Sequence, residues 1–499
     1  MTADQQVGPI PGLGPAALEV MNRSPYRNAQ WAVSVTDAVT GEPLVDHNAD
    51  LLMGPASVTK TYSAAAAWTR FGAASRIVTP VVRSGPVHAG VLRGSLVLVA
   101  RGDITLGGQT GADGRAVFAD IDHNDANALL TATLPGNRPL AGIRDLARQV
   151  RAAGIRRVTG EVVIDDRLFR TVELGDDGPV SPVVLNNNLI DIVARPTRPG
   201  QPARVRLRPH LAPWRLINRT TTTAPGRSTT MTVTGTERGA LTVSGRIPAN
   251  SGPVLRVWHV ADPATFARTA FIRELRRVGI SVTADPHRSN PRGGLPSRQD
   301  VQRLPRVARL RSLPMSEHVR YVLKVSYNRG AQTLVCLLAV HAGSRDCDAG
   351  FPVMGDQLAD VGIDPTQVAL SDGSGRPGNL VTARSATDLM QAFAHRDDWA
   401  LWRDTLPVLG RDGSLADVQR SSPAAGHVFA KTGTNASGDF VNGRIRLETK
   451  TLSGYIQARS GRWLAMAIIV NEGVFDDLAG LTAANQDLGE IAADIWATY

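Results

Sequence analysis

Lysine is scarce in this 499-residue sequence: four of its 55 basic residues are lysines, and the other 51 are arginines. Because arginine supplies nearly all of the positive charge, each lysine calls for an explanation of its own. An arginine side chain does not lose its proton in proteins, so it cannot replace a lysine that acts as a base. The four lysines are Lys60, Lys324, Lys431 and Lys450.

Long hydrophobic runs are absent from the sequence. No stretch approaches the roughly 18–20 apolar residues that a membrane-spanning helix needs. The first six residues, Met1–Gln6, do not form a signal peptide, so we expect that any export signal has been removed or never existed. With 42% hydrophobic and 20% charged residues, the composition is that of a globular protein, and its length predicts two or three domains.

Blocks of consecutive basic residues are also missing, although the net charge is +10 and the pI is about 10.2. Such a charge allows an acidic partner, either nucleic acid or an anionic cell envelope. The densest basic segment, Arg303–Arg311, contains a proline and no aromatic residue. We interpret it as solvated surface and expect no nucleic-acid partner.

Metal-ligand patterns are lacking as well. The ten histidines are scattered, and the two cysteines, Cys336 and Cys347, have no histidine partners at metal-binding spacing. We therefore expect neither a metal nor another cofactor. The cysteines are compatible with a disulfide in an oxidising compartment, or with Cys336 as one more buried residue of the apolar run Leu334–Val340.

The most informative stretch that is present is Gly54–Lys60, with the sequence GPASVTK. Pro55 and the alanines that follow predict a helix that begins near Pro55 and ends at Gly72. Lys60 lies three residues after Ser57 and therefore on the same helix face. A serine hydroxyl needs a neighbouring base to become a nucleophile, and a neutral lysine amine can be that base. Alone, the pattern also fits an ordinary helix start with a surface lysine.

Two further motifs follow in the chain, Ser326-Tyr327-Asn328 and Lys431-Thr432-Gly433-Thr434. Taken separately, the first is compatible with a helix cap and the second with a turn at a strand end. By composition, a Lys-Thr-Gly triplet should arise about 0.03 times and a Ser-x-x-Lys about 0.2 times in such a sequence. In this order, the three motifs resemble those of penicillin-binding proteins and serine β-lactamases.

Four other segments narrow the resemblance: Gly102–Leu106, Val163–Asp166, Asp372–Gly375 and Leu409–Leu415. With them the chain resembles, from Trp31 nearly to its end, the D-alanyl-D-alanine carboxypeptidase/endopeptidase family. These are the class C low-molecular-mass penicillin-binding proteins, peptidase family S13. The sequence departs from the family pattern at Ile104, where proline is usual, and at Tyr327, where aspartate is common.

The resemblance implies an α+β fold with a β-lactamase/transpeptidase-like catalytic domain, in which an antiparallel sheet carries helices on both faces. Between Lys60 and Ser326 lie 265 residues, which is room for one or two further domains. We therefore predict a discontinuous catalytic domain, residues 1–85 and 300–499. Large, nested, β-rich accessory domains are predicted to occupy residues 86–299.

Sequence patterns predict several elements within this frame. Alternating apolar residues from Trp31 to Val35 and a following run Pro43–His47 predict a β-hairpin. The other predicted elements are the strands Val158–Ile164, Val428–Lys431, Leu452–Ala458 and Trp463–Val470, the helices Ser316–Val325 and Arg329–His341, a C-terminal helix from Leu478, and a linker, Asp285–Asp300.

For catalysis, the resemblance implies that Ser57 attacks the carbonyl between two D-alanines. Lys60 would be the general base, kept partly neutral by burial and by the cation Lys431. Ser326 would relay a proton to the departing amine, and Asn328 would hold Lys60 and the substrate amide.

For substrate binding, the resemblance assigns the segment Lys431–Thr434, including Gly433. Lys431, Thr432 and Thr434 would hold the terminal carboxylate of the substrate. The backbone N–H groups of Ser57 and Thr434 would form the oxyanion hole.

The implied function is that of a serine D-alanyl-D-alanine carboxypeptidase, with additional endopeptidase activity left open by the resemblance. Its partners would be peptidoglycan stem peptides ending in D-Ala-D-Ala, with β-lactam antibiotics as inhibitors, outside the cytoplasm in the periplasm or cell wall or as a secreted protein. A serine β-lactamase and a non-catalytic wall-binding protein are the alternatives. The segment from Asn328 to Lys431 contains no glutamate to activate water, although Tyr327 stands where class C β-lactamases have a tyrosine.

Overall fold

The computed structural model describes residues 7–211, 213–293 and 295–499, so Met1–Gln6, on which the signal-peptide interpretation rests, lies outside the described residues. The chain divides into two compact units. The first comprises Met1–Ala74 and Met315–Tyr499, and the second comprises Ser75–Pro314. The first unit therefore uses both ends of the chain, and the second is inserted in its sequence. The predicted accessory region, residues 86–299, lies within the second unit.

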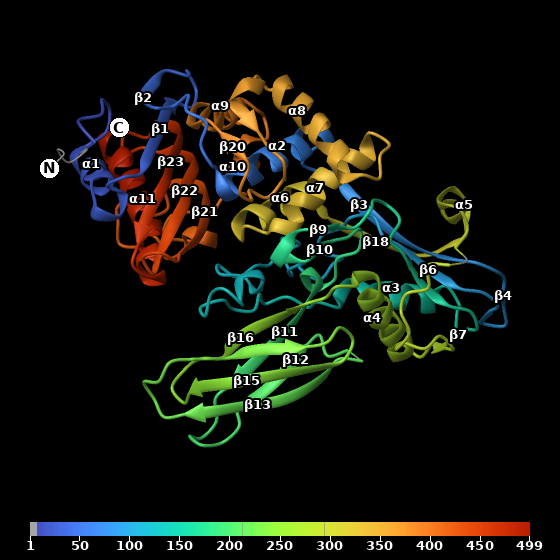
Figure 1. Cartoon of the computed structure of the whole chain (residues 1–499). Coiled ribbons are helices and arrows are strands. Elements are labelled where there is room, and N and C mark those ends of the chain that lie inside the picture. The colour runs from blue at the N-terminus through green and yellow to red at the C-terminus, as the bar shows by residue number, and fades with distance from the viewer. Residues whose placement is uncertain (1–6, 212, 294) are drawn as a thin grey trace. The chain divides into compact units, whose positions relative to one another are not determined.

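The first unit contains most of the helices (Figure 1). Its helices are α1 (Pro15–Met21), α2 (Thr59–Phe71), α6 (Met315–Lys324), α7 (Asn328–His341), α8 (Gly350–Asp360), α9 (Ala383–Ala394), α10 (Trp399–Arg403) and α11 (Leu478–Thr498). Its strands are β1 (Gln30–Asp37), β2 (Pro43–His47), β19 (Val368–Ala369), β20 (Leu380–Val381), β21 (Val428–Asp439), β22 (Arg444–Gln457) and β23 (Trp463–Phe475). Within the part of the chain that the structure describes, no helix has the length and apolar character needed to cross a bilayer.

A five-stranded antiparallel sheet, in the order β2-β1-β23-β22-β21, organises the first unit. Along β23, every second side chain from Leu464 to Val470 belongs to the core shared with α1 and α11. The intervening Ala465, Ala467 and Ile469 belong to the core shared with α2 and α9. The sheet is thus buried on both faces between helices (Figure 1), and the predicted α+β fold is confirmed.

Strands β21 and β22 are longer than the sequence predicts. The predicted strand ends at Lys431, whereas β21 continues to Asp439 and remains paired with β22 throughout. Residues 435–439 at the end of β21 are small or polar, so they lack the apolar alternation that identifies a half-buried strand, yet their backbone groups still pair. The tip of this hairpin exposes Phe440 and Val441, which are 95% and 93% accessible.

The second unit is rich in short strands (Figure 1). Its helices are α3 (Ala141–Ala152), α4 (Pro263–Arg277) and α5 (Arg298–Arg303). Its strands are β3 (Arg76–Arg83), β4 (Val87–His88), β5 (Val91–Leu92), β6 (Leu96–Val99), β7 (Arg157–Val158), β8 (Val162–Asp165), β9 (Val172–Glu173), β10 (Pro179–Val180), β11 (Leu189–Arg195), β12 (Arg204–Arg208), β13 (Arg215–Thr223), β14 (Thr232–Gly235), β15 (Ala240–Pro248), β16 (Val254–His259), β17 (Ser281–Val282) and β18 (Arg306–Pro314).

These strands form two four-stranded sheets, β17-β7-β5-β4 and β18-β3-β6-β8, two three-stranded sheets, β12-β11-β16 and β13-β15-β14, and the two-stranded sheet β10-β9. The prediction of one strand over Val158–Ile164 is wrong, because β7 and β8 lie in different sheets. Between them the backbone of Gly160 bonds to that of Gly94, where the chain passes from one sheet to the other. The apolar residues on both sides made the two short strands look continuous.

The predicted linker Asp285–Asp300 is also structured in part. Asn290 is 7% exposed, and its amide side chain bonds to both the N–H and the C=O of Ile164, at 2.8 Å each. It therefore satisfies the edge of β8 as a neighbouring strand would. The helix α5 begins at Arg298, inside the predicted linker.

Cys336 on α7 and Cys347 form a disulfide, and both side chains are fully buried. Of the two alternatives left open by the sequence, the disulfide holds, and Cys336 is buried as well. The bridge ties the middle of α7 to the turn that precedes α8.

We expect this disulfide to stabilise the first unit by about 2–3 kcal/mol, because it closes a short loop in the unfolded chain. The oxidised protein should therefore unfold at a higher urea concentration than the double variant Cys336→Ala/Cys347→Ala. A thiol titration of the denatured, unreduced protein should find no free thiol. Two free thiols per chain would contradict the bridge.

Candidate active site

Ser57 and Lys60 meet as the sequence predicts. Lys60 Nζ donates a hydrogen bond to Ser57 Oγ at 2.6 Å, and the lysine side chain is fully buried. Ser57 lies in a 3-10 turn, Ala56–Val58, directly before α2, rather than in the first turn of the α-helix itself. Ala56 has φ +43°, a left-handed conformation that costs free energy in a residue with a Cβ atom. The backbone is therefore strained immediately before the serine, as often occurs at functional sites.

A turn far away in the sequence supplies a second acceptor for Lys60. Lys60 Nζ also donates to the carbonyl oxygen of Ser374 at 2.6 Å. Asp372 fixes this turn, because one carboxylate oxygen accepts from Ser374 N, Ser374 Oγ and Gly375 N at 2.6–2.9 Å. A Cβ atom at Gly375 would lie 1.8 Å from Ala56 O, so only glycine allows the turn to approach the serine this closely. No spacing in the sequence predicted the contact between Lys60 and Ser374.

The Ser326-Tyr327-Asn328 motif forms the junction between α6 and α7, both of which pack in the same core as α2. Ser326 has φ +56°, a second left-handed residue at a predicted catalytic position. Tyr327 is 2% exposed, and its backbone N–H bonds to Val322 O at 2.9 Å. The strained serine is thus held between two anchored helix ends.

Lys324, just before this motif, is 2% exposed and pairs with both carboxylate oxygens of Asp412 at 2.6 and 2.8 Å. Burial lowers the pKa of Lys324, and the charge of Asp412 opposes that shift. Asp412 belongs to the loop segment Leu409–Leu415, which the sequence singled out by resemblance only. The structure gives this segment a physical role, since it neutralises the lysine at the end of α6.

The Lys431–Thr434 segment lies on the edge strand β21. Because side chains alternate along a strand, Lys431 and Gly433 share one face of the sheet, and Thr432 and Thr434 share the other. A Cβ atom at Gly433 would lie 2.7 Å from Pro55 O, so β21 rests against the turn that carries the serine. Lys431 is fully buried, and its ammonium group donates to Thr432 O at 2.5 Å.

The two threonines have polar partners on their own face. The hydroxyl of Thr432 lies 2.7 Å from that of Ser414. Thr434 is exposed, and its hydroxyl accepts a hydrogen bond from Lys450 Nζ at 2.5 Å. Lys450 Nζ also bonds to the amide oxygen of Asn485 on α11. Burial alone lowers the pKa of Lys450 to about 7.

All four lysines of the chain are therefore buried: Lys60 and Lys431 completely, Lys324 and Lys450 with 2% exposure each. The sequence assigned roles to the first two and left the others unexplained. The scarcity of lysine in the sequence was the signal from which Lys324 and Lys450 could also have been proposed as site residues.

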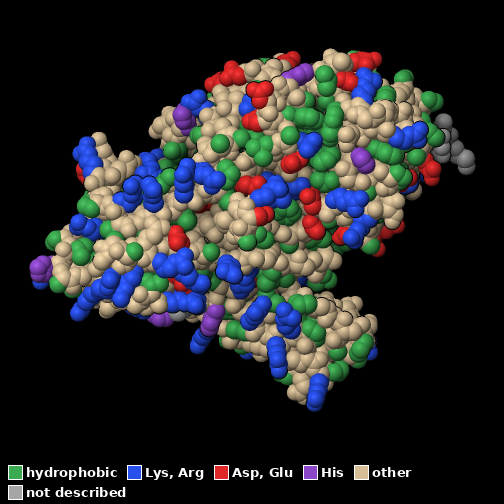
Figure 2. Space-filling model, turned by 180° about the vertical axis from the view of Figure 1, so that it is seen from behind, with side chains coloured by type: hydrophobic (Ala, Val, Ile, Leu, Met, Phe, Trp, Pro, Cys, Tyr) green, Lys and Arg blue, Asp and Glu red, His purple; other side chains and the backbone are tan. Residues whose placement is uncertain are grey.

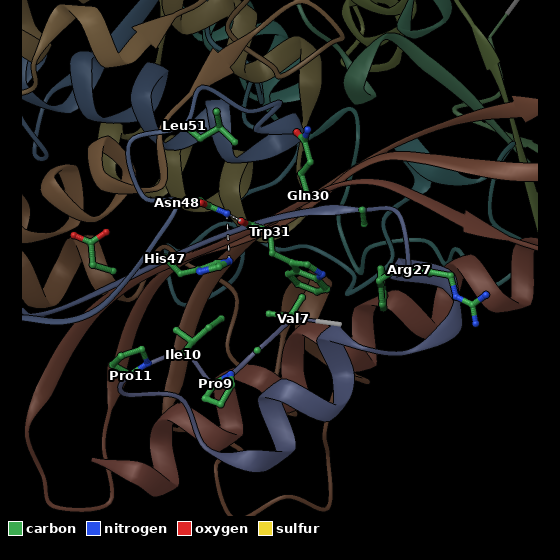
Figure 3. Close-up of a pocket in the computed structure, with 14 residues that line it drawn as sticks. Val7, Pro9, Ile10, Pro11, Arg27, Gln30, Trp31, His47, Asn48 and Leu51 are labelled. Atoms are coloured by element: carbon green, nitrogen blue, oxygen red, sulfur yellow. Dashed lines mark hydrogen bonds between the residues drawn. The ribbon is translucent and has the colours of Figure 1, made fainter. Parts of the chain in front are cut away.

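A cavity of about 500 Å³ elsewhere in the first unit is lined by residues that include Trp31, His47 and Asn48 (Figure 3). Asn48 donates to the backbone oxygen of Trp31 at 2.8 Å and so braces one wall. The described lining residues contain no serine, cysteine, threonine or lysine, so this cavity lacks the nucleophile and base that Ser57 and Lys60 provide. Across residues 7–211, 213–293 and 295–499, no group of histidine, cysteine or acidic residues is arranged to hold a metal ion.

Comparison with known proteins concerns nearly the whole chain. The profile of the D-Ala-D-Ala carboxypeptidase 3 (S13) family matches residues 16–493. A D-alanyl-D-alanine carboxypeptidase from Actinomadura sp. (strain R39) is 30% identical over 468 residues, which cover 88% of this chain and 77% of that protein. Carboxypeptidase DacB from Mycolicibacterium smegmatis is 27% identical over 456 residues, covering 88% of this chain and 75% of that protein.

The fold is also similar to a solved structure. The crystal structure of penicillin binding protein 4 (dacB) from Haemophilus influenzae has a TM-score of 0.67, with 18% sequence identity, and covers 95% of this chain and 98% of that one. At this identity the likeness concerns the fold alone. Because the family profile extends over almost the whole chain, this protein belongs to the D-Ala-D-Ala carboxypeptidase (S13) family of serine peptidases and penicillin-binding proteins.

Proposed function

We propose that Ser57 is the nucleophile and Lys60 the general base of the D-Ala-D-Ala carboxypeptidase reaction that defines this family. The observation that carries the proposal is the 2.6 Å hydrogen bond between Lys60 Nζ and Ser57 Oγ. Burial of the amine supports it, because a low-dielectric surrounding disfavours the ammonium form and leaves a nitrogen able to take the serine proton.

In the proposed reaction, Ser57 Oγ attacks the carbonyl carbon between the two terminal D-alanines, and its proton passes to Lys60. The backbone N–H groups of Ser57 and Thr434 stabilise the negative oxygen. Ser326 passes a proton to the departing amine of D-alanine, while Asn328 holds Lys60 and the substrate amide. Water then hydrolyses the ester and releases the shortened peptide.

Substrate binding is proposed for the segment Lys431–Thr434. Its cation and hydroxyl groups would hold the terminal carboxylate of a peptidoglycan stem peptide, and Gly433 would let the substrate lie close to β21. Lys450 adds a further element, because its bond to the exposed Thr434 hydroxyl leaves the threonine proton free to donate outward. An anion that accepts a hydrogen bond from the Thr434 hydroxyl would thus be separated from the buried amine of Lys450 only by that hydroxyl group.

We also propose that the protein acts outside the cytoplasm, in the periplasm, in the cell wall or as a secreted protein. The disulfide supports an oxidising compartment. The catalytic domain would comprise residues 1–85 and 300–499, with residues 86–299 as nested accessory domains. A β-lactamase function is less well supported, because Tyr327 is buried against Tyr321 and so is poorly placed to activate water.

Penicillin should acylate Ser57 and form an adduct that lasts minutes or longer. Intact mass and peptide mapping after incubation with penicillin should place the adduct on the peptide that contains Ser57. The Ser57→Ala variant should carry none, and the wild type should release D-alanine from peptides ending in D-Ala-D-Ala. A relative's structure has been solved in complex with a β-lactam, which supports this expectation. Rapid, repeated hydrolysis of nitrocefin without D-alanine release would instead identify a β-lactamase.

Replacing Lys60 by arginine should lower the rate of acylation by about three orders of magnitude or more, because arginine keeps the charge but cannot act as a base. Pre-steady-state labelling with a fluorescent penicillin measures this rate. The matched control is Arg70→Lys, an exchange at the other end of α2 that should leave the rate unchanged. Near-normal acylation of Lys60→Arg would show that the base lies elsewhere.

Lys450 should make substrate binding pH-dependent. Below pH 7 the Lys450 amine carries a proton and attracts the substrate carboxylate, whereas above pH 7 it becomes neutral. The KM for peptides with a free terminal carboxylate should therefore rise roughly tenfold between pH 7 and pH 9. The KM of the Lys450→Met variant should be high at pH 7 and nearly independent of pH, and amidated peptides should show no such dependence with either protein.

The matched control is Arg446→Met, which removes an exposed cation from the same strand, where it pairs with Glu472. Its KM should follow the wild-type profile. If the profile of Lys450→Met coincides with that of the wild type, Lys450 has no part in carboxylate binding.

A further inference from the structure

Positive charge is concentrated in one stretch of the second unit. Residues 195–260 contain eleven arginines and a single acidic residue, Glu237, which gives a net charge of +10. That value equals the net charge of the whole chain, so the remaining residues balance to zero. In Figure 2, the lobe at the lower right, formed by β11–β16, carries blue side chains among hydrophobic and neutral atoms.

Three of these arginines lie on one side of the sheet β13-β15-β14. The parallel register pairs Arg219 with Ser244 and Thr221 with Arg246, so residues of this parity share one face. Arg215 belongs to the same face because it lies four residues before Arg219 on β13. All three arginines are exposed, whereas Leu241, Val243 and Ile247 point to the opposite face and are fully buried.

Hydroxyl groups occupy most of the other positions on this face. We define the arginine–threonine face as Arg215, Arg219, Arg246, Thr221, Thr232, Thr234, Thr242 and Ser244. Two of its members, Thr232 and Thr234, come from β14, whose register places them beside Ser244 and Thr242. The face therefore presents mainly cationic and hydroxyl groups, beside Ile217, which is 36% exposed, and the small Ala240 opposite Arg215.

The exposed arginines of this stretch have no acidic partners among the described residues, while the less exposed ones do have partners. Arg208 pairs with the buried Asp191 at 2.8 Å, and Arg256 donates to the backbone oxygens of Ala126 and Met231. On the sheet β12-β11-β16, Arg195 of β11 is the direct cross-strand partner of Arg204 on β12. Like charges in such pairs are unfavourable, so an external anion would relieve a repulsion that the fold itself leaves in place.

We propose that the arginine–threonine face docks a linear phosphodiester polymer of the cell envelope. Guanidinium groups bind phosphate through paired, charge-assisted hydrogen bonds, and hydroxyl groups add further donors. Arg215 and Arg219 are about 13 Å apart along the strand, which suits successive charges of an extended chain better than one small anion. The choice of an envelope polymer rests on the extracytoplasmic location given under the proposed function.

Two other polyanions fit the face less well. Single-stranded nucleic acid is usually bound by aromatic side chains on which bases stack, and the face contains none. Insertion into a lipid surface requires exposed large apolar residues, and the face offers only the partly exposed Ile217. A phosphodiester chain without bases or acyl tails matches the groups that are present.

The test compares the binding of full-length wild type and the triple variant Arg215→Gln/Arg219→Gln/Arg246→Gln to a synthetic poly(glycerol phosphate). Fluorescence anisotropy over a series of salt concentrations should show affinity reduced about tenfold or more in the variant. The slope of log affinity against log salt should become shallower by about 2 to 3, as expected when three phosphate contacts are lost. The rate of penicillin acylation should be unchanged, so this result is independent of the catalytic assignment.

The matched control is Arg306→Gln/Arg309→Gln/Arg311→Gln, which removes three exposed arginines from β18 of the same unit. Its affinity should stay close to that of the wild type. Equal losses of affinity in the two triple variants would show that binding depends only on net charge, and would overturn the proposal. So would an undetectable affinity of the wild type at physiological salt, tighter binding of single-stranded DNA with the same number of phosphates, or binding only to vesicles that contain phosphatidylglycerol. Matching melting temperatures of the three proteins exclude a folding defect.

Discussion

Burial of the Lys60 amine beside the Ser57 hydroxyl is the constraint on which the active-site architecture of the first unit depends. An isolated ammonium group is costly to bury, so the site must surround the nitrogen with acceptors that do not fix it as a cation. The structure meets this demand with a hydroxyl and a backbone carbonyl, at 2.6 Å each. Asp372, the carboxylate that shapes the turn, accepts hydrogen bonds from the backbone N–H groups of Ser374 and Gly375 and so holds the Ser374 carbonyl at the amine.

This arrangement requires three segments that are far apart in the chain. The serine turn comes from the N-terminal part, the Asp372–Gly375 turn lies more than 300 residues later, and β21 follows after a further stretch. Gly375 and Gly433 approach the backbone before Ser57 from two sides, each where a Cβ atom would collide with it. The five-stranded sheet joins the two ends of the chain, because β1, which precedes the serine turn, pairs with β23, which follows β21 and β22. An insertion of 240 residues is compatible with this geometry, because all five strands of the sheet belong to the first unit and pair with one another.

Arginine and lysine have separate uses in this protein. Ser75–Pro314 contains 35 arginines, 18 acidic residues and no lysine, whereas all four lysines lie buried in the first unit. A lysine amine changes its pKa readily when buried and binds as a single point, which suits proton transfer and the neutralisation of one carboxylate. The guanidinium group stays charged at every working pH, which suits a surface whose ligand is an anion. The second unit thus carries its positive charge on arginines alone, whereas the first unit buries all the lysines of the chain.

The sequence by itself determined the family, the α+β class and the short distance between Ser57 and Lys60, because residues three positions apart lie together in a helical segment. It also located the hairpin β1–β2, the strands β21–β23 and the helices α2, α6, α7 and α11, because apolar periodicity and helix-end signals are local properties. It did not determine the contact of Lys60 with Ser374, the bond from Lys450 to Thr434, or the shared face of Arg215, Arg219 and Arg246. Strand pairing decided the last two, since register places residues side by side that are 16 or 25 positions apart. Nor could periodicity reveal the polar end of β21 or the division of Val158–Ile164 between two sheets. Those features depend on which backbone a strand pairs with, and only the tertiary structure specifies that partner.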